Sequence, residues 1–410
     1  MREKCPFRIQ PRSKLNKGTD LAKIIYHHRT LGDGAEGIHI REMVNAFRSI
    51  GHTVVVTGPT GEPDGASNKK KTTGSRFKNM LPQIFFEMLE LGYSFYCFIL
   101  LCFKIRKIKP DFIYDRYITF NAGAIWAGRL CGIPVVLEVN APLAFERSTE
   151  SDERLFFKKW AFKLERYICS HADMTIVVST PLKDYLESAG VPAGKCHVMP
   201  NGVNQRTFSP KIKNQSIIKT LGIPNDATII GFAGILRPWH GLELVIEAVA
   251  GLKSSGRNVY LLIVGDGPIR QQIEKTLMEV DLSKHFCITG RIRHDMVADY
   301  VNIFDIAVSP KATFYASPMK IVEYMALGKA VVAPDSQNFR DMIDNEENGI
   351  LFSNDTGKTL TEALELLCDS SSLRRQLGNK ARSKVENRLN WEWNANEVYR
   401  QINARQWERN

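Results

Sequence analysis

The chain has 410 residues, of which 44% are hydrophobic and 24% are charged, and this length and balance predict a folded protein of two domains rather than a disordered one. Lysine and arginine outnumber the acidic residues by 55 to 44, and residues 1–110 alone hold nineteen basic and nine acidic side chains. Because this excess is local and forms no stripes along the chain, it argues against a protein that wraps nucleic acid.

The eight cysteines are scattered and include no C-x-x-C pair. This spacing argues against a zinc ribbon or a thioredoxin-like site and is typical of a reducing cytosol. The first residues, MREKCPFRIQPRSK, are polar and basic with no apolar run behind them, so we expect no secretory signal.

Short apolar runs alternate with amphipathic segments, which is the pattern of βαβ units and parallel sheets. In the first half we predict strands at Ala22–Tyr26, Thr53–Thr57, Asp111–Tyr114, Pro134–Val139 and Met174–Val178. After a turn-rich segment at 198–210 we predict strands at Thr228–Ala233, Val259–Val264, Phe286–Thr289, Ile306–Ser309 and Ala330–Ala333, and a last helix at Trp391–Gln406. The pattern therefore predicts two successive α/β domains, whose ligands lie at the carboxyl ends of the strands.

Residues 84–103 depart from this pattern, because a strongly apolar run lies there between two basic segments. The run is long enough to span a membrane, but Glu87 and Glu90 would then lie in hydrocarbon at a cost of about 3 kcal/mol each. The alternatives are a core helix of the first domain and an amphipathic helix on a membrane surface, with its basic flanks on anionic head groups.

The loop after the first strand reads G-D-G-A-E-G over residues 32–37, a G-x-G-x-x-G sequence. Such glycines let a ligand approach the backbone at a helix N-terminus, so Gly37 is a candidate binding residue; the alternative is close packing of helix and strand. A nicotinamide dinucleotide also needs an acidic residue at the end of the second strand, which instead ends in Thr57. His27 and His28 end the first strand, where either is a candidate for an acceptor phosphate or for the core.

Three turns in the second half carry polar residues at predicted strand ends. The candidates in them are Gly234, Arg237, His240, Gly265, Asp266 and Arg291. The guanidinium fork of Arg237 suits bidentate pairing with phosphate. Asp266 has the alternative role of capping its own turn.

The segment Ser317-Pro318-Met319-Lys320 predicts the start of a helix, because proline is favoured where its missing N–H is not needed. The free N–H groups of the first turn and Lys320 suit a diphosphate. Glu323 lies one turn further on, where its carboxylate can accept hydrogen bonds from both hydroxyls of a ribose. Its neighbours are apolar, and a buried carboxylate needs a partner.

The order of these segments resembles the retaining glycosyltransferases of family 4. The resemblance covers nearly the whole chain and rests on GAEGIHIREMVNAFRSIGHTVVV, VMPNGVN, GFAGILRPWHG, IVGDGP and SPMKIVEYMALGKAVVAPD. It implies the GT-B fold, with two facing Rossmann-like parallel-sheet domains and a cleft between them. By this resemblance an acceptor-binding domain covers 1–204, a nucleotide-sugar-binding domain covers 205–388, and a C-terminal helix at 389–410 crosses back to the first domain.

The chain departs from the family pattern at four positions. Glu323 matches the second of two family glutamates, but the first falls on Tyr315. The usual Gly-Arg after the first strand of the second domain has Ile235 as its second residue, and a lysine is replaced by His240. A histidine expected after the strand 134–139 is replaced by Asn140.

The resemblance implies transfer of a sugar from a UDP- or GDP-linked donor to a lipid-linked or glycan acceptor. The catalytic candidates are Arg237, Lys320, Glu138 and Asn140. The candidates for donor binding are Gly37, Gly234, His240, Gly265, Asp266, Arg291, Ser317, Pro318, Met319 and Glu323. No D-x-D motif lies near these strand ends, so we expect neither a catalytic metal nor another cofactor.

Two alternatives remain at this stage. One is a catalytically silent scaffold that binds a nucleotide-sugar, favoured by the departures at Tyr315, Ile235 and Asn140. The other is an NAD(P)-dependent oxidoreductase, disfavoured by the missing acidic residue. For the location we expect a cytoplasmic protein held peripherally at the inner face of the membrane. Its partners are then an anionic membrane surface, a donor and an acceptor, but no nucleic acid.

Overall fold

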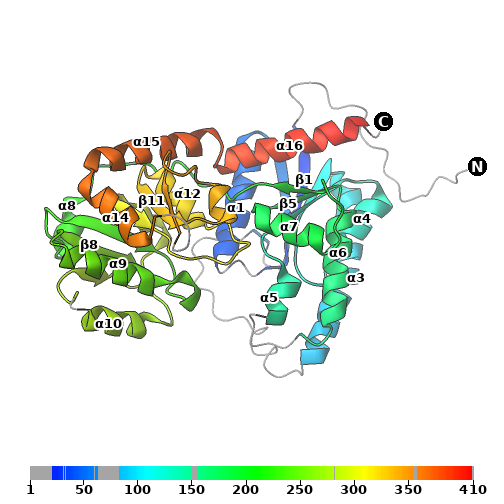
Figure 1. The fold of residues 1–410 in the computed structure, drawn as a ribbon. Helices are drawn as coiled ribbons and strands as arrows, with labels where there is room; N and C mark the ends of the chain where they lie inside the picture. Colours follow the sequence, from blue (N-terminus) through cyan, green and yellow to red (C-terminus); the bar gives the residue numbers. More distant parts are fainter. Residues whose placement is uncertain are drawn as a thin grey trace, which may run out of the picture. The chain divides into compact units, whose positions relative to one another are not determined.

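The computed structural model describes residues 21–408 apart from Leu31, Asp33, Thr60, 63–82, 150–154, Asp281 and 354–357. The described chain forms two compact units. The first unit comprises the chain up to Met199 and again from Asn394, and the second unit is Pro200–Trp393. Each unit contains a six-stranded sheet whose neighbouring strands run parallel (Figure 1).

The sheet of the first unit has the order β2-β1-β3-β4-β5-β6. These strands are β1 (Lys23–His27), β2 (Thr53–Thr57), β3 (Phe112–Arg116), β4 (Val135–Val139), β5 (Met174–Val177) and β6 (Cys196–Val198). Its helices are α1 (Ala35–Ser49), α3 (Gln83–Ile108), α4 (Gly123–Cys131), α5 (Leu143–Thr149), α6 (Lys158–His171) and α7 (Thr180–Ser188). The direction of strand addition reverses between β1 and β3, which makes this pair the topological switch point of the sheet.

The sheet of the second unit has the order β12-β11-β10-β7-β8-β9, so its switch point lies between β10 and β7. These strands are β7 (Thr228–Ala233), β8 (Val259–Val264), β9 (Phe286–Ile288), β10 (Ile306–Val308), β11 (Ala330–Pro334) and β12 (Ile350–Phe352). The helices are α8 (Gln215–Thr220), η1 (Pro238–His240), α9 (Leu242–Ser254), α10 (Arg270–Glu279), α11 (His294–Asn302), α12 (Met319–Ala326), α13 (Gln337–Arg340), α14 (Leu360–Asp369) and α15 (Ser371–Asn387).

Both faces of the second sheet are buried, which explains why its strands are continuous apolar runs. Along β7, Ile229 and Ala233 belong to the core layer that includes side chains of α12, and Ile230 and Phe232 belong to the layer that includes side chains of α9 and α14. Helices α9 and α14 pack side by side on that second face (Figure 1).

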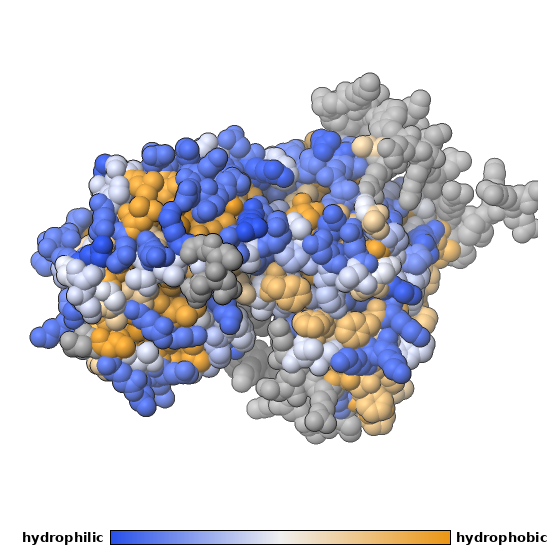
Figure 2. Space-filling model, viewed as in Figure 1, coloured by the Kyte–Doolittle hydropathy of each residue, from blue (hydrophilic) through white to orange (hydrophobic). Residues whose placement is uncertain are grey.

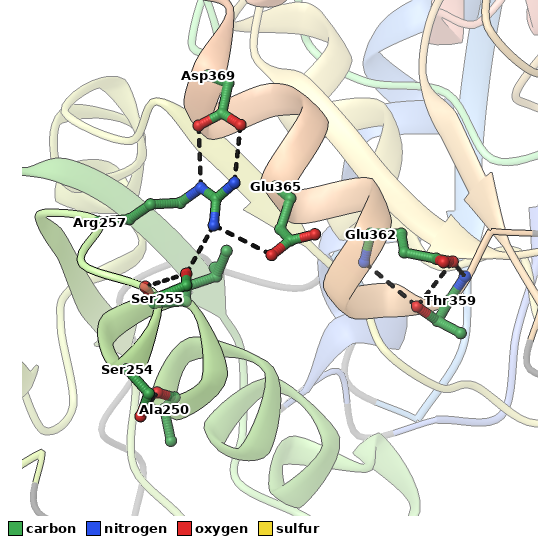
Figure 3. Close-up of polar contacts among 9 residues, drawn as sticks. Ala250, Ser254, Ser255, Arg257, Thr359, Glu362, Glu365 and Asp369 are labelled. Carbon is green, nitrogen blue, oxygen red and sulfur yellow. Dashed lines mark hydrogen bonds and ion pairs between the residues drawn. The ribbon is translucent and has the colours of Figure 1, made fainter.

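Polar contacts at the ends of α9 and α14 fix these two helices together (Figure 3). The guanidinium group of Arg257 donates to both carboxylate oxygens of Asp369 at 2.8 and 2.9 Å, and to Glu365 at 3.1 Å. Thr359 and Glu362 form a capping box at the start of α14, in which the hydroxyl of Thr359 accepts from the N–H of Glu362 and the carboxylate accepts from the N–H of Thr359.

Helix α16 (Trp391–Glu408) begins in the second unit and continues in the first from Asn394 onward. The ring of Tyr399 on this helix lies 4.3 Å from the ring of His52 in the first unit. The ten expected strands and this helix are confirmed. Two strands, β6 and β12, were not predicted; each is three residues long and lies at a sheet edge, as does β9, which was predicted.

Candidate functional site

The loops after β7 and β8 approach each other so closely that they require glycine. Gly234 and Gly265 have φ angles of 150° and 148°, and a Cβ on Gly265 would lie 2.0 Å from the carbonyl oxygen of Gly234. A Cβ on Gly267 would lie 2.3 Å from the carbonyl oxygen of Leu236. These glycines therefore bring backbone from two strand ends together at the edge of the sheet, where ligands of such sheets bind.

Lys320 extends from the first turn of α12 to the end of β7. Its Nζ lies 4.1 Å from the centre of the Phe232 ring and 3.3 Å from the place that a Cβ of Gly234 would take. This ammonium group is buried and has no hydrogen-bond partner among the described residues. The hydroxyl of Tyr324 accepts the N–H of Ala233 at 2.7 Å, which holds α12 against this strand end.

Lys320 and Glu323 lie three positions apart on α12, and the charge of each affects the pKa of the other. Burial lowers the pKa of Lys320 to about 7, although the negative charge of Glu323 opposes this shift. Burial also raises the pKa of Glu323 to about 7, against the positive charge of Lys320. Titratable groups displaced this far from their ordinary values are concentrated in functional sites.

His240 ends the short helix η1 and lies near the same lysine. Its ring centre is 5.4 Å from that of Phe232. Burial, together with the positive charge of Lys320, lowers the pKa of His240 to about 4. The imidazole is therefore neutral at neutral pH, so His240 does not supply the positive charge of the lysine that it replaces.

Three residues at the start of α12 have different surroundings. The hydroxyl of Ser317 accepts the N–H of Asn201 at 3.0 Å, and its carbonyl oxygen accepts from the Asn201 amide at 2.8 Å. Ser317 therefore holds the turn-rich segment at the start of the second unit, and its hydroxyl is not free for a ligand. Pro318 is the N-cap residue and Met319 is the first helical residue. The N–H of Ile321 donates to the carbonyl oxygen of Pro318 at 3.0 Å, whereas the N–H groups of Met319 and Lys320 come too early in the helix to have an acceptor within it.

The other candidates in the second unit lie at the surface. Arg237 is exposed, and its guanidinium carbon lies 5.3 Å from the centre of the Trp239 ring. Arg291 is exposed as well. The carboxylate of Asp266 accepts the N–H of Gly267 at 2.9 Å, so the aspartate caps its own turn, which is the alternative that the sequence left open.

Glu138 lies at the carboxyl end of β4 in a network of three hydrogen bonds. One of its oxygens accepts from Arg116 at 2.6 Å and from the amide of Asn140, and the other accepts from the hydroxyl of Tyr114 at 2.7 Å. Nδ1 of His39 lies 3.5 Å from the same carboxylate. Burial tends to raise the pKa of Glu138, but the charges of His39 and Arg116 outweigh it and hold this pKa below its ordinary value.

This geometry argues against Glu138 as a nucleophile, because three hydrogen bonds already hold its two oxygens and its side chain is only 2% exposed. Its contacts make it a positioning residue for Arg116 and Asn140. The sequence reasoning missed Arg116 and His39. A signal for Arg116 was present, since a charged residue at the carboxyl end of a buried strand lies at the ligand edge of the sheet.

Gly37 lies in α1 and is needed for packing within the unit. A Cβ on Gly37 would stand 2.1 Å from the carbonyl oxygen of Gly32, so the loop after β1 occupies the space that the glycine leaves. At the end of the neighbouring β2, the hydroxyl of Thr57 accepts from Lys104 at 3.1 Å. This strand end therefore carries a positive charge, whereas the ribose of a dinucleotide requires a carboxylate there.

Helix α3 is the one helix among the described residues that is long and apolar enough to span a membrane. Its acidic side chains nevertheless point into the first unit. The two carboxylate oxygens of Glu87 accept the backbone N–H groups of Phe156 and Phe157 at 2.7 Å, and Glu90 pairs with Arg29 at 3.2 Å and with Arg147 at 2.9 Å. A helix bonded in this way lies along the unit rather than across a bilayer.

The opposite face of α3 is apolar and exposed. Seven side chains that are 53–67% exposed lie within an arc of about 120° on the helix: Phe85, Met88, Leu89, Phe95, Tyr96, Ile99 and Phe103. We call this set the α3 apolar face. Phe156 and Trp160, 63% and 60% exposed, lie near its beginning, and Arg106 and Lys107 lie at its end. Figure 2 shows hydrophobic residues at the surface around the lower end of α3.

No group of three or more histidine, cysteine, aspartate or glutamate side chains that could hold a metal ion occurs in the described part of the chain.

Two family models match successive parts of the chain. The model described as Glycosyltransferase Family 4 matches residues 36–206, and the model described as Glycosyl transferases group 1 matches residues 213–384. Together they cover every strand of the two sheets except β1, which precedes residue 36.

The curated relatives are distant. The alpha-D-kanosaminyltransferase of Streptomyces kanamyceticus is 24% identical over 62% of this chain and 66% of its own length. The GDP-mannose-dependent alpha-mannosyltransferase of Mycobacterium tuberculosis is 24% identical over 76% of this chain and 78% of its own length. The chain thus spans slightly less than two thirds of the first of these relatives.

Solved structures share the fold of the whole chain. Anabaena HepE in complex with UDP-glucose superposes with a TM-score of 0.66 at 15% identity, over 93% of this chain and 100% of the other. The two parallel six-stranded sheets and this likeness establish the GT-B fold.

Proposed function

We propose that this chain, which belongs to the family 4 glycosyltransferases, transfers a sugar from a nucleotide-sugar donor to a lipid-linked or glycan acceptor, with retention of the anomeric configuration. The observation that carries the proposal is the Lys320–Glu323 pair at the switch point of the second unit. A buried ammonium group without a hydrogen-bond partner needs an anion, and the diphosphate of a UDP- or GDP-linked sugar supplies one.

The donor in this proposal lies along the start of α12. Its diphosphate takes hydrogen bonds from Lys320 and from the N–H groups of Met319 and Lys320, which the helix dipole favours. Its ribose hydroxyls donate to the carboxylate of Glu323, and Arg237 closes on the phosphate from the exposed loop after β7. Gly234 lets the diphosphate approach the backbone. The support from other proteins is that HepE was solved with UDP-glucose.

The reaction then depends on positioning and on charge. The bond between the anomeric carbon and the diphosphate oxygen breaks, the acceptor oxygen bonds to that carbon on the same face, and the acceptor's proton leaves with the diphosphate. Lys320 and Arg237 stabilise the negative charge that develops on the leaving group. The proposal uses no enzymic nucleophile, in keeping with the occupied carboxylate of Glu138, and no metal ion or other cofactor.

We further place the enzyme in the cytoplasm, at the inner face of the membrane, with the α3 apolar face in the lipid. Each large side chain of this face gains about 1.5–3 kcal/mol if it is fully buried, and each nearby basic residue gains about 1 kcal/mol on an anionic surface. The sign of the charge at the end of the helix, with Arg106 and Lys107, matches anionic head groups. A lipid-linked acceptor would be presented in the same plane.

The donor assignment is tested by thermal shift and by turnover. UDP-, GDP-, ADP- and CMP-sugars are screened against the protein, with NAD⁺ and NADP⁺ as controls, because a ligand of the folded state raises the melting temperature. We expect one nucleotide-sugar to stabilise the protein and to be consumed with a lipid-linked or glycan acceptor. Stabilisation without any turnover would favour the silent scaffold, and stabilisation by a nicotinamide dinucleotide alone would overturn the proposal.

The membrane assignment is tested by vesicle flotation. The variant Leu89→Glu/Ile99→Glu interrupts the α3 apolar face without touching its buried side, and Met278→Glu/Ile212→Glu is a matched control at exposed apolar positions of the second unit. We expect the first variant alone to lose binding to anionic vesicles. Equal binding of both variants and the wild type would refute the assignment. Lys69, Lys70 and Lys71, a basic run that precedes α3 in the sequence, lie outside the described residues.

A further inference from the structure

Four buried polar atoms in two neighbouring loops of the first unit have no hydrogen-bond partner among the described residues. They are Nη1 of Arg29 and Oγ1 of Thr30, which follow β1, and Oγ1 of Thr119 and Nδ2 of Asn121, which follow β3. Oε2 of Glu90 on α3 is a buried acceptor that likewise makes no hydrogen bond there, although it lies 2.9 Å from the guanidinium group of Arg147. Thr119 is 0% exposed and Asn121 is 2% exposed. Because β1 and β3 are paired neighbours, these two loops leave the same edge of the sheet. Buried polar groups are nearly always satisfied, so such a set indicates a site for a polar ligand.

One turn of α3 holds both loops together. Its Glu90 accepts from Arg29 at 3.2 Å and pairs with Arg147 at 2.9 Å, and the guanidinium group of Arg29 lies 4.7 Å from the ring centre of Tyr93. The guanidinium group of Arg147 lies 5.7 Å from the ring centre of Phe120. This chain of contacts connects the residues after β1 with those after β3.

The loop after β3 is held in an unusual conformation. Phe120, between Thr119 and Asn121, has a φ of 67°, a left-handed value that a bulky residue rarely adopts. The hydroxyl of Ser94 on α3 donates to the carbonyl oxygen of Phe120 and accepts the N–H of Ala122 at 3.1 Å. Strained backbone of this kind persists where surrounding contacts impose it, and it is concentrated at ligand sites.

The charges select the class of ligand. Two guanidinium groups, those of Arg29 and Arg147, share the single carboxylate of Glu90, so this group carries one net positive charge. The amide nitrogen of Asn121 and the free guanidinium nitrogen of Arg29 are donors only, and the two threonine hydroxyls can donate. Hydrogen-bond donors around a net positive charge match an oxyanion.

His27, the earlier candidate for such a contact, is excluded by its own partners. Its Nδ1 lies 2.6 Å from a carboxylate oxygen of Asp115, and its Nε2 lies 3.4 Å from Sγ of Cys97. Burial tends to lower the pKa of His27, but Asp115 outweighs it and raises this pKa to about 10. The pair is an internal ion pair with no net charge.

We propose that Arg29, Thr30, Thr119 and Asn121 bind a phosphate group of the acceptor, so that the acceptor is a phosphate or diphosphate ester rather than an uncharged glycan. This inference rests on the proposed function, because it assigns the acceptor site of that enzyme. It agrees with the position of the site on the buried side of α3, whose other side is the α3 apolar face. A lipid chain attached to the phosphate would then be near the membrane.

The test measures binding of two phosphate probes, a short-chain prenyl diphosphate and inorganic pyrophosphate. All variants carry Lys320→Met, so that phosphate binding in the second unit does not contribute. Asn121→Asp is the most informative change, because the carboxylate keeps the oxygen that caps the N–H of Gly123 and places a negative charge where the amide donor was. Thr119→Val removes one hydroxyl at constant shape. Arg48→Gln, at an exposed arginine paired with Glu62, is the control.

We expect Asn121→Asp to weaken binding of prenyl diphosphate more than 30-fold, and Thr119→Val to weaken it 3- to 10-fold, with Arg48→Gln unchanged. If pyrophosphate binds weakly and the same variants reduce its binding, the result supports a phosphate site. If the prenyl ester binds more tightly than pyrophosphate, the phosphate that the site recognises belongs to a lipid. Unchanged binding of both probes in folded Asn121→Asp and Thr119→Val would overturn the proposal.

A second arm separates this proposal from the proposed function. With wild-type Lys320, the donor affinity of Asn121→Asp is expected to stay unchanged while the KM for a phosphate-linked acceptor rises. If no nucleotide-sugar is bound or consumed, but the variants still reduce phosphate binding, the proposed function fails and the phosphate site stands. If KM rises equally for an acceptor that lacks phosphate, the site binds sugar hydroxyls and the phosphate assignment is wrong.

Discussion

Replacing Lys320 by methionine tests the donor site at its most unusual feature. In the free protein the ammonium group is buried, has no hydrogen-bond partner, and lies 4.1 Å from the centre of an aromatic ring. A charge-assisted hydrogen bond contributes about 1.5–3 kcal/mol, so its loss should weaken nucleoside diphosphate binding about 10- to 100-fold. Methionine has a similar length and no charge, so the packing around Phe232 is retained.

The same substitution should stabilise the free protein. Burial lowers the pKa of this lysine from 10.5 to about 7, so below pH 7 the folded state carries a charge that burial disfavours. The cost is complete below the folded-state pKa and disappears as the pH rises towards the unfolded value of 10.5. We expect a gain of roughly 2–4 kcal/mol near pH 6, seen as a higher melting temperature. Greater stability together with lower affinity is the signature of a charge retained for binding.

Donor affinity should also depend on pH with a maximum near 7. Above pH 7 the free Lys320 loses its proton, so binding must take up a proton and weakens by up to about tenfold per pH unit. Below pH 7 the carboxylate of Glu323, whose pKa burial raises to about 7, becomes protonated and accepts the ribose hydroxyls less well. Lys320→Arg should abolish the alkaline decrease, because arginine stays charged.

Isothermal calorimetry with UDP and GDP between pH 6 and 9, beside melting curves, makes these measurements. Lys329→Met is the matched control, because Lys329 is a second lysine of the same unit whose pKa burial lowers to about 8, and its Nζ donates to a backbone carbonyl 2.5 Å away. We expect this control to bind the nucleotide normally. If Lys320→Met bound it as tightly as the wild type at pH 6 to 7, the lysine would not contact the diphosphate and the donor site would be misplaced.

Glu323→Gln retains the shape of the side chain but loses its charge, so donor affinity measured by calorimetry should fall about 10- to 100-fold while the melting temperature holds; a collapse of melting with unchanged affinity would show a structural carboxylate instead. Arg237→Ala should lower the transfer rate about 100-fold in a single-turnover assay, and Arg237→Lys should recover only part of that rate because the planar fork is lost. A wild-type rate in the alanine variant would mean that Lys320, and not Arg237, stabilises the negative charge on the leaving group. Gly265→Ala should destabilise the second unit by about 2 kcal/mol or more in denaturant unfolding, because its Cβ would meet a carbonyl oxygen 2.0 Å away, and an unchanged midpoint would mean that the loop can move.

Local pattern alone predicted the two sheets and the main features of the second unit. Buried parallel strands are continuous apolar runs whatever their neighbours are, so ten of the twelve strands were predictable. The segment from Ser317 to Glu323 was equally accessible, because a helix N-terminus and residues one turn apart on that helix are defined within a few positions of sequence. The proposal that Lys320 and Glu323 share one site therefore needed no tertiary information.

Tertiary structure decided the roles that depend on partners far away in sequence. Sequence alone left Glu138 as a candidate reacting group, but in the structure Arg116 and Tyr114, on the neighbouring strand, each donate a hydrogen bond to its carboxylate. The sequence left the role of the run at 84–103 open, because it does not show which carboxylates pair with other groups inside the folded unit. In the structure both Glu87 and Glu90 have such partners.

The cluster of Arg29, Thr30, Thr119 and Asn121 has no sequence motif at all. It exists because β1 and β3 pair across a separation of 88 residues, so that two unrelated loops leave the same sheet edge. Strand and helix formation depends on neighbours in sequence, whereas the burial, charge balance and occupancy of a polar side chain depend on the order of the strands in the sheet. That order is set by packing of the whole unit, which only the tertiary structure reveals.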